Sequence, residues 1–192
     1  MFKIVTHLFL TGIILLLAVP TTASLQAVRV EGVAFQRSVT VRDNHLTLQG
    51  YGLLRYMLFI KAYVGALYLP QAAGAADVLG PVAKRLELQY FHAIKGEDFA
   101  RATRTKIADN TTPVQAEQLR SRIEQLVALY EDVQPGDRYT LTYVPGRGTE
   151  LALNDRSLGT VRGSDFARAL FAVWLGDNPI DTDFRDVLLG VR

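Results

Sequence analysis

The stretch LLRYMLFIKAYVGALYLP, residues 53–70, is a long apolar run interrupted by two cations and three tyrosines. Its β-branched and aromatic side chains, with no acidic residue among them, predict one long central β-strand with both faces at least partly buried. Pro70 ends this strand, since proline has no N–H to donate to a sheet ladder. The stretch therefore predicts the middle of a sheet, and it raises the question of why a core segment carries Arg55 and Lys61.

Shorter strands are predicted on both sides of this segment. Residues 28–30, 39–41 and 45–48 alternate between apolar and polar side chains, and so do residues 85–91 (RLELQYF). Turns are expected between them at Gly32, at Asp43-Asn44 and at Gly50-Tyr51-Gly52, the last directly before the long apolar run. These signals indicate short antiparallel strands.

The hydrophobic period changes after residue 96. A first helix is expected to begin near Glu97-Asp98, whose carboxylates suit the positive end of the helix dipole. A second helix begins at Thr112 or Pro113, and its apolar residues recur at the spacing of one helical stripe. The members of that stripe are Leu119, Ile123, Leu126, Val127 and Tyr130.

The last third of the chain predicts strands followed by helices. Residues 139–144 and 150–153 alternate as the two arms of a hairpin, and residues 154–159 are expected to form a further turn. Ser164 is the expected N-cap of a helix that runs to Leu175, and a short helix follows from about Asp181. Strands and helices in this order predict an α+β fold with an antiparallel sheet backed by helices.

The N-terminus has the pattern of a secretory signal peptide over residues 1–23. Lys3 supplies the positive start, residues 8–19 are apolar, and small residues at 20–23 suit cleavage. The apolar part is shorter than the roughly 20 residues of a membrane-spanning helix, so we expect no stable membrane span after cleavage; an uncleaved anchor is the alternative. Residues 24–192 are then one periplasmic or secreted domain.

Composition excludes several classes of function. Without Lys3 the chain has 20 Lys and Arg against 19 Asp and Glu, with no basic stripe, so no nucleic-acid partner is expected. The chain has no cysteine, which excludes disulfides and thiolate chemistry. His45 and His92 lack the spacing of a metal site, and the acidic residues between 177 and 186 fit helix caps better than a calcium site. We expect no metal and no cofactor, and the oligomeric state stays open.

Three segments together resemble the chalcone isomerase family, and most closely its exported bacterial chalcone-isomerase-like branch. They are IKAYVGALYLP (60–70), PGDRYTLTYVPGRGTELALN (135–154) and FARALFAVWLGDNPIDTDFRDVLLG (166–190), in which WLGDNPID is the most specific piece. The resemblance implies an open-faced β-sandwich, in which a large antiparallel sheet is backed by helices with a ligand cleft between them. That agrees with the α+β prediction.

The resemblance also implies where the site lies. Members that are enzymes use an arginine and a threonine on early strands, a tyrosine and an asparagine on the first helix, and a threonine on the late helix. The corresponding residues in this chain are Arg55, Tyr63, Phe99, Lys106 and Val173. At most the arginine is kept. Phe99 and Val173 cannot donate the hydrogen bonds that stabilise charge during the cyclisation of a chalcone, so no catalytic residue is assigned.

These replacements favour a non-catalytic binder of a fatty acid or another small apolar carboxylate. A tyrosine at position 63 is similar to the fatty-acid-binding relatives, in which an arginine and a tyrosine hold the ligand carboxylate, and guanidinium binds carboxylate bidentately. One alternative is an intramolecular lyase or isomerase with Arg55 as electrophile and Tyr63 as acid/base, in which the nearby cation lowers the pKa of the phenol. A second alternative is a structural or partner-binding domain with a filled cleft.

The spacing of the two proposed carboxylate ligands sets a geometric condition. On one unbroken strand, Arg55 and Tyr63 would share a face but lie roughly 26 Å apart, at about 3.3 Å per residue. They meet at one carboxylate only if the strand bends, and residues 57–59 hold no Gly or Pro. The plainer interpretation is that Tyr63 and Tyr68 are core-rim residues, and that Arg55 and Lys61 reach solvent at the sheet edge.

Overall fold

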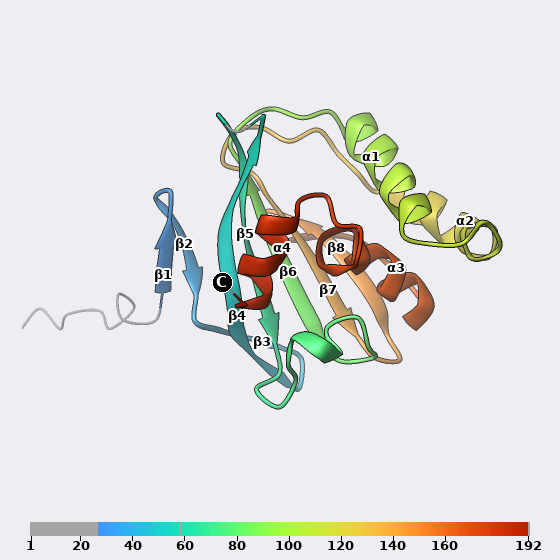
Figure 1. Cartoon of the computed structure of the whole chain (residues 1–192), viewed down its shortest axis with the longest axis horizontal. Helices are drawn as coiled ribbons and strands as arrows, with labels where there is room; N and C mark the ends of the chain where they lie inside the picture. Colours follow the sequence, from blue (N-terminus) through green and yellow to red (C-terminus); the bar gives the residue numbers. More distant parts are fainter. Residues whose placement is uncertain (1–26, 58, 192) are drawn as a thin grey trace, which may run out of the picture.

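The computed structural model describes residues 27–57 and 59–191 (Figure 1). The predicted signal peptide at 1–23, and residues 24–26 of the predicted domain, lie outside the described residues. Seven strands form one antiparallel sheet in the order β3-β4-β5-β6-β7-β8-β9, and β1 and β2 form a separate hairpin. Their bounds are β1 Ala27–Val30, β2 Val33–Gln36, β3 Ser38–Val41, β4 Asn44–Tyr56, β5 Ile60–Leu69, β6 Lys84–Tyr90, β7 Arg138–Val144, β8 Gly148–Leu153 and β9 Arg156–Val161.

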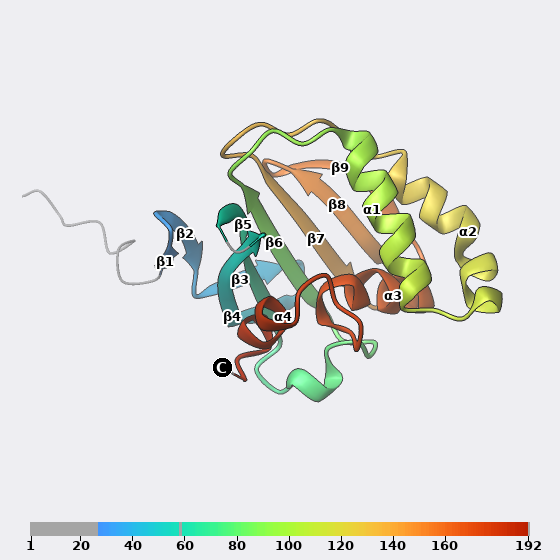
Figure 2. The ribbon, with the colours of Figure 1, turned by 45° about the horizontal axis from the view of Figure 1, so that its top comes forward.

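Four α-helices cover one face of the large sheet (Figure 2). They are α1 Gly96–Asp109, α2 Pro113–Val127, α3 Ser164–Leu175 and α4 Thr182–Leu189, and a short 3-10 turn, η2, spans Ala75–Asp77. The main hydrophobic core lies between these helices and the sheet. This arrangement confirms the predicted α+β architecture. No helix in the described part of the chain is long and apolar enough to span a bilayer.

The opposite face of the sheet is covered in part by the β1–β2 hairpin. A second hydrophobic cluster joins Val28, Val33 and Phe35 of that hairpin to Val64 and Tyr68 of β5. Beside it, the side chains of β6 and β7 that point away from the helices form a charged network.

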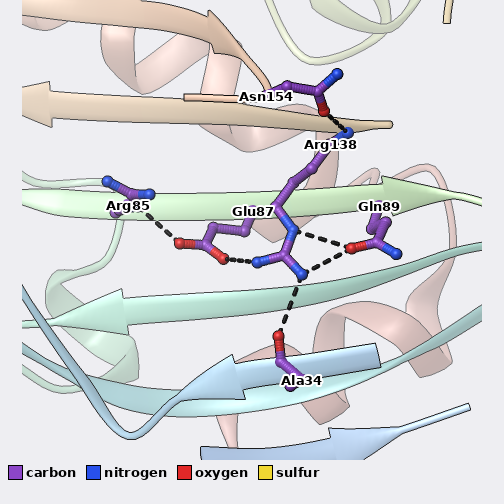
Figure 3. Close-up of polar contacts among 6 residues, drawn as sticks. All are labelled: Ala34, Arg85, Glu87, Gln89, Arg138 and Asn154. Atoms are coloured by element: carbon purple, nitrogen blue, oxygen red, sulfur yellow. Dashed lines mark hydrogen bonds and ion pairs between the residues drawn. The ribbon is translucent and has the colours of Figure 1, made fainter. Parts of the chain in front are cut away.

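Arg138 is the centre of that network, and its guanidinium lies between Glu87 and Gln89 (Figure 3). Its Nη1 donates to Glu87 Oε2 at 2.8 Å, and its Nη2 donates to the carbonyl of Ala34 at 3.1 Å. Arg85 Nε donates to the other oxygen of Glu87 at 2.8 Å. The network therefore ties the N-terminal hairpin to the sheet.

The predicted single strand over residues 53–70 is wrong, because the chain turns back on itself in its middle. Strand β4 ends at Tyr56 and β5 begins at Ile60, and the two pair antiparallel with Leu54 opposite Tyr63 and Arg55 opposite Lys61. The turn forms with Met57 at φ 49° and a hydrogen bond from Phe59 N to Met57 O. Sequence reasoning missed this turn because it has none of the usual turn residues.

The turn predicted at Gly50-Tyr51-Gly52 is also wrong, since these residues lie inside β4. Helix α4 crosses this strand so closely that a Cβ on Gly50 would lie 2.1 Å from Val187 O. A Cβ on Gly52 would meet the Val187 side chain at 2.6 Å. Glycine is present here because it lets the helix pack close to the strand, and not because the chain turns.

Other local predictions fit the structure closely. Thr112 caps α2 by accepting a hydrogen bond from Gln115 N, and Asp181 caps α4 by accepting one from Phe184 N at 2.7 Å. Helix α3 covers Ser164–Leu175, with Gly163 and not Ser164 as its N-cap. The turn predicted at 154–159 is shorter than expected, because Asn154 and Asp155 alone make it and β9 begins at Arg156.

Candidate functional site

An apolar cavity of about 250 Å³ lies between the sheet and helices α1 and α3. Strands β5 to β8 supply its floor and the helices supply its walls, so it occupies the layer in which the main core packs. Its lining residues are Tyr63, Leu88, Tyr90, Ile94, Asp98, Phe99, Ala102, Thr103, Lys106, Tyr130, Tyr139, Leu141, Leu151, Val173, Trp174 and Ile180.

The exposed lining residues show where the cavity reaches solvent. Ala102 and Lys106 lie one turn apart on α1, and Ile180, in the loop between α3 and α4, is 39% exposed. Asn110 ties that loop to α1 by donating to the Asn178 carbonyl at 2.8 Å. The mouth of the cavity is therefore at the junction of α1 and the 176–181 loop.

Aromatic rings line the inner end of the cavity. Tyr90 lies edge-on to Tyr63 and Phe99, with ring centroids 5.4 Å and 5.1 Å away. Phe99 also contacts Tyr139 edge-on at 5.2 Å and Tyr130 at 5.5 Å. Edge-to-face contacts of this kind add rigidity to the surface area that the rings bury. The inner wall is thus a preformed apolar surface.

Four hydroxyl groups beside the cavity already have partners. Trp174 Nε1 donates to Tyr63 Oη at 3.2 Å, and the hydroxyls of Thr103 and Tyr130 lie 3.0 Å apart. Tyr139 Oη donates to the carbonyl of Glu131 at 2.8 Å. These hydrogen bonds fix the orientations of the rings, and the apolar parts of the rings line the cavity.

Burial raises the pKa of each cavity tyrosine. It raises the pKa of Tyr130 and Tyr139 to about 12, and it raises those of Tyr63 and Tyr90 further above the ordinary value. For Tyr63 the opposing hydrogen bond from Trp174 is the smaller effect. A phenol held neutral in this way binds as a hydrogen-bond partner and is a poor base near neutral pH.

The cavity brings together four of the five residues predicted as ligand-binding. Tyr63 on β5, Phe99 and Lys106 on α1, and Val173 on α3 all line it. Arg55 does not lie on the cavity wall. Its side chain is 46% exposed, and its Nη2 lies 3.8 Å from Glu31 in the β1–β2 turn.

The turn at 57–59 explains this separation. Leu54, opposite Tyr63, belongs to the core on the helix-covered side, so Arg55, the next residue of β4, points to the opposite face and toward the β1–β2 hairpin. Lys61, across from Arg55, donates to the same Glu31 carboxylate at 2.6 Å. Both cations of the opening stretch therefore reach solvent, as the plainer interpretation expected.

Two charged side chains lie on the wall formed by α1. Lys106 has a 25% exposed side chain, and its Nζ lies 3.4 Å from Asp109, a long and weak pairing. Asp98, also on the lining, pairs with Arg101 on the same helix. The Asp98 charge is thus balanced locally, and Lys106 is the cation among the described lining residues.

Sequence reasoning missed several cavity residues. Tyr130 was assigned to the apolar stripe of α2, and Tyr139 was seen only as part of an alternating strand. Trp174 lies in the WLGDNPID segment that carried the resemblance, yet its contact with Tyr63 spans 111 positions. No local pattern indicates such a pair.

A larger hollow of about 640 Å³ lies on the surface between α2, α3 and the 79–81 loop. Its lining mixes Gln115, Gln118, Asp165 and Arg168 with apolar residues such as Leu119, so it is more polar than the aromatic cavity. The described residues contain no group of His, Asp and Glu side chains that could hold a metal ion. The aromatic cavity is therefore the candidate site.

Comparisons with known proteins agree with this architecture. A family model described as chalcone isomerase-like matches residues 27–190, whereas no curated protein matches the chain. Among solved structures, the chain is similar to the crystal structure of a fatty-acid binding protein from Arabidopsis thaliana, with a TM-score of 0.67. The two chains are 16% identical, and the match covers 85% of this chain and 95% of that chain. At this identity the likeness concerns the fold, which is the chalcone isomerase type that the sequence predicted.

Proposed function

The chain belongs to the chalcone isomerase-like family, and we propose that it is a non-catalytic member that binds a small apolar carboxylate, such as a fatty acid, in the aromatic cavity. The observation that carries the proposal is an apolar cavity with a cation at its mouth. Apolar walls with a few convergent polar groups are the usual features of a small-molecule site. A cleft filled by side chains, as a purely structural domain would have, does not fit this geometry.

The size of the cavity favours a short or medium acyl chain. A methylene group takes up about as much space as a water molecule, roughly 30 Å³, so about 250 Å³ holds on the order of eight heavy atoms. A longer chain would have to extend through the mouth or push the aromatic rings apart. We therefore expect an acid of about six to ten carbons to fit best.

Lys106 is the proposed partner of the ligand carboxylate. Its Nζ is near the mouth, and its long contact with Asp109 leaves donor capacity for an anion. The acyl chain would then pack against Phe99 and Val173, with its end toward Tyr63 and Tyr90. In this arrangement the head group lies at the solvent side, where its charge costs least to bind.

An intramolecular lyase or isomerase is the weaker alternative. It required a cation near Tyr63 to lower the pKa of the phenol, but Arg55 lies with Glu31 outside the cavity wall, and burial raises the pKa of Tyr63. Phe99 and Val173 add no hydrogen-bond donor. We also propose that the protein is exported to the periplasm or secreted, on the pattern of residues 1–23.

The first test is native mass spectrometry of the protein purified without added lipid, followed by titration with hexanoic, octanoic, decanoic and hexadecanoic acids. We expect octanoic or decanoic acid to bind most tightly. Val173→Phe, which fills the cavity, should weaken binding at least about tenfold, and Lys106→Met should do so by about tenfold through the lost charged hydrogen bond.

Arg104→Met is the matched control for Lys106→Met, because Arg104 lies on the same helix and pairs with Glu124 away from the cavity. Thermal unfolding of each variant checks that it folds. A protein that binds none of the acids would refute the proposal. Loss of binding in Arg55→Ala, with Lys106→Met unchanged, would instead place the head group where the resemblance put it.

A further inference from the structure

At the tip of the β4–β5 hairpin, the four described residues between positions 56 and 60 all have exposed apolar side chains. Tyr56 is 60% exposed, Met57 69%, Phe59 85% and Ile60 45%. These four residues, called here the hairpin tip, lie within the apolar run of residues 53–70, where the chain turns back on itself. A contiguous exposed apolar group of this kind usually marks an interaction site.

The hairpin tip projects beyond the rest of the sheet. Strands β5 and β6 pair from Tyr68–Arg85 to Tyr63–Tyr90, and the last bond between them runs from Phe91 N to Ala62 O. Beyond Ala62, residues 60 and 61 pair with β4 alone. At about 3.3 Å per residue, the tip extends on the order of 10 Å past the neighbouring strand. Figure 1 shows this hairpin rising at one end of the sheet.

The residue at the turn is costly both for backbone conformation and for solubility. Met57 has φ 49°, a region that glycine and asparagine adopt far more readily. The other positive-φ positions in hairpin turns of the described chain carry Glu31-Gly32, Arg42, Gly146 and Asn154-Asp155, which are polar or glycine. A strained and exposed methionine points to a role outside the fold itself.

Cations lie directly behind the apolar side chains. Arg55 and Lys61 face each other at the base of the tip, and their side chains are 46% and 48% exposed. Glu31 contacts both and balances one of the two positive charges. Arg29, also exposed, lies on the adjoining β1 strand. The base of the tip therefore has a net positive charge.

We propose that the hairpin tip inserts into the interface of an anionic lipid bilayer, with Met57 and Phe59 among the acyl chains. Tyr56 then lies at the level of the head groups, where amphipathic rings are favoured, and Arg55 and Lys61 reach the lipid phosphates. A protein partner fits less well, because a stable interface needs about 800 Å² on each side and four side chains on a narrow projection do not offer it. The proposal does not depend on what occupies the cavity.

The test is sedimentation of the protein with vesicles of phosphatidylcholine, alone or mixed in equal parts with phosphatidylglycerol. The protein tested begins at residue 24, after the predicted signal peptide, so that the apolar residues of that peptide do not themselves bind the vesicles. We expect binding to the mixed vesicles and at least about tenfold weaker partitioning for Met57→Ser/Phe59→Ser, since each fully buried large apolar side chain is worth about one order of magnitude or more.

Val114→Ser is the matched control, because Val114 is a 67% exposed apolar residue on α2, far from the tip in the sequence, and its loss should leave vesicle binding unchanged. Arg55→Gln/Lys61→Gln should weaken binding to the mixed vesicles only. Equal binding by the tip variant and the unchanged protein would overturn the proposal. So would a dimer in sedimentation equilibrium that Phe59→Ser dissociates, because the tip would then bind a second copy of this chain.

Discussion

The two faces of strand β6 bury polar groups in opposite ways. Toward the outer face, Arg85, Glu87 and Gln89 join Arg138 in a network in which both Glu87 oxygens accept hydrogen bonds (Figure 3). Toward the helices, Leu88 and Tyr90 border an apolar cavity. On the outer face, the charged side chains thus pair with one another. On the helix-covered face, neutral hydroxyl groups lie beside an open cavity. The difference indicates that the first face holds the fold together and the second is available to a ligand.

Breaking the outer network should have the largest effect on stability. Glu87→Ala leaves two arginines, each about a quarter exposed, without their carboxylate, and we expect the free energy of unfolding to fall by about 2–3 kcal/mol. Urea denaturation measures this change. The matched control is Glu150→Ala, at a less buried carboxylate on β8, the second strand from β6 in the same sheet, which should change stability by no more than about 0.5 kcal/mol. Equal effects of the two variants would show that the network is not structural.

Removing a hydroxyl on the helix-covered face should have a smaller effect. Tyr63→Phe leaves the buried Trp174 N–H without its acceptor, so we expect a loss of about 1–2 kcal/mol. The exposed Tyr51→Phe serves as a control with an expected change near zero. If a double-mutant cycle of Tyr63→Phe with Trp174→Phe shows no coupling, the cavity wall is not held by this hydrogen bond.

The smallest effect on the free energy of unfolding is expected from Lys84, a buried cation on the helix-covered face. Its Nζ lies over the rings of Tyr143 and Phe171 and donates to Gly80 O at 2.7 Å, and burial lowers its pKa from 10.5 to about 8. Between pH 8 and 10.5 the unfolded chain therefore binds more protons at this residue than the folded chain does. Stability should rise by about 1 kcal/mol from pH 8 to pH 9.

Thermal or urea unfolding of Lys84→Met across the same pH range isolates this contribution, because that variant should show no rise. Above pH 10 both proteins should lose stability, since burial raises the pKa of the cavity tyrosines and the unfolded chain then releases their protons first. A rise of equal size in Lys84→Met would assign the titration to another group.

Local chemistry predicted many of the elements. The Thr112 cap, the Asp181 cap of α4 and the stripe of α2 depend on neighbours within a few residues, and the structure shows them. Tyr130, the last residue predicted for that stripe, is the exception, because α2 ends at Val127. The β4–β5 turn was not predictable in this way, because its residues favour a strand and the turn is evident only from the antiparallel pairing of β4 with β5. Because the chain turns between Tyr56 and Ile60, Arg55 lies beside Glu31 and not in the predicted site.

The sequence by itself determined the alternation of strands, the helix ends and the residue types that make an apolar cavity, since propensity, capping and hydrophobic period act over short distances. Only the tertiary structure decided that Tyr63, Phe99, Lys106 and Val173 line one cavity and that Arg55 does not. Their meeting depends on strand register, where a shift of one residue turns each side chain to the other face. Register pairs residues that are far apart in the chain, such as Leu88 and Tyr139, and no local pattern contains it.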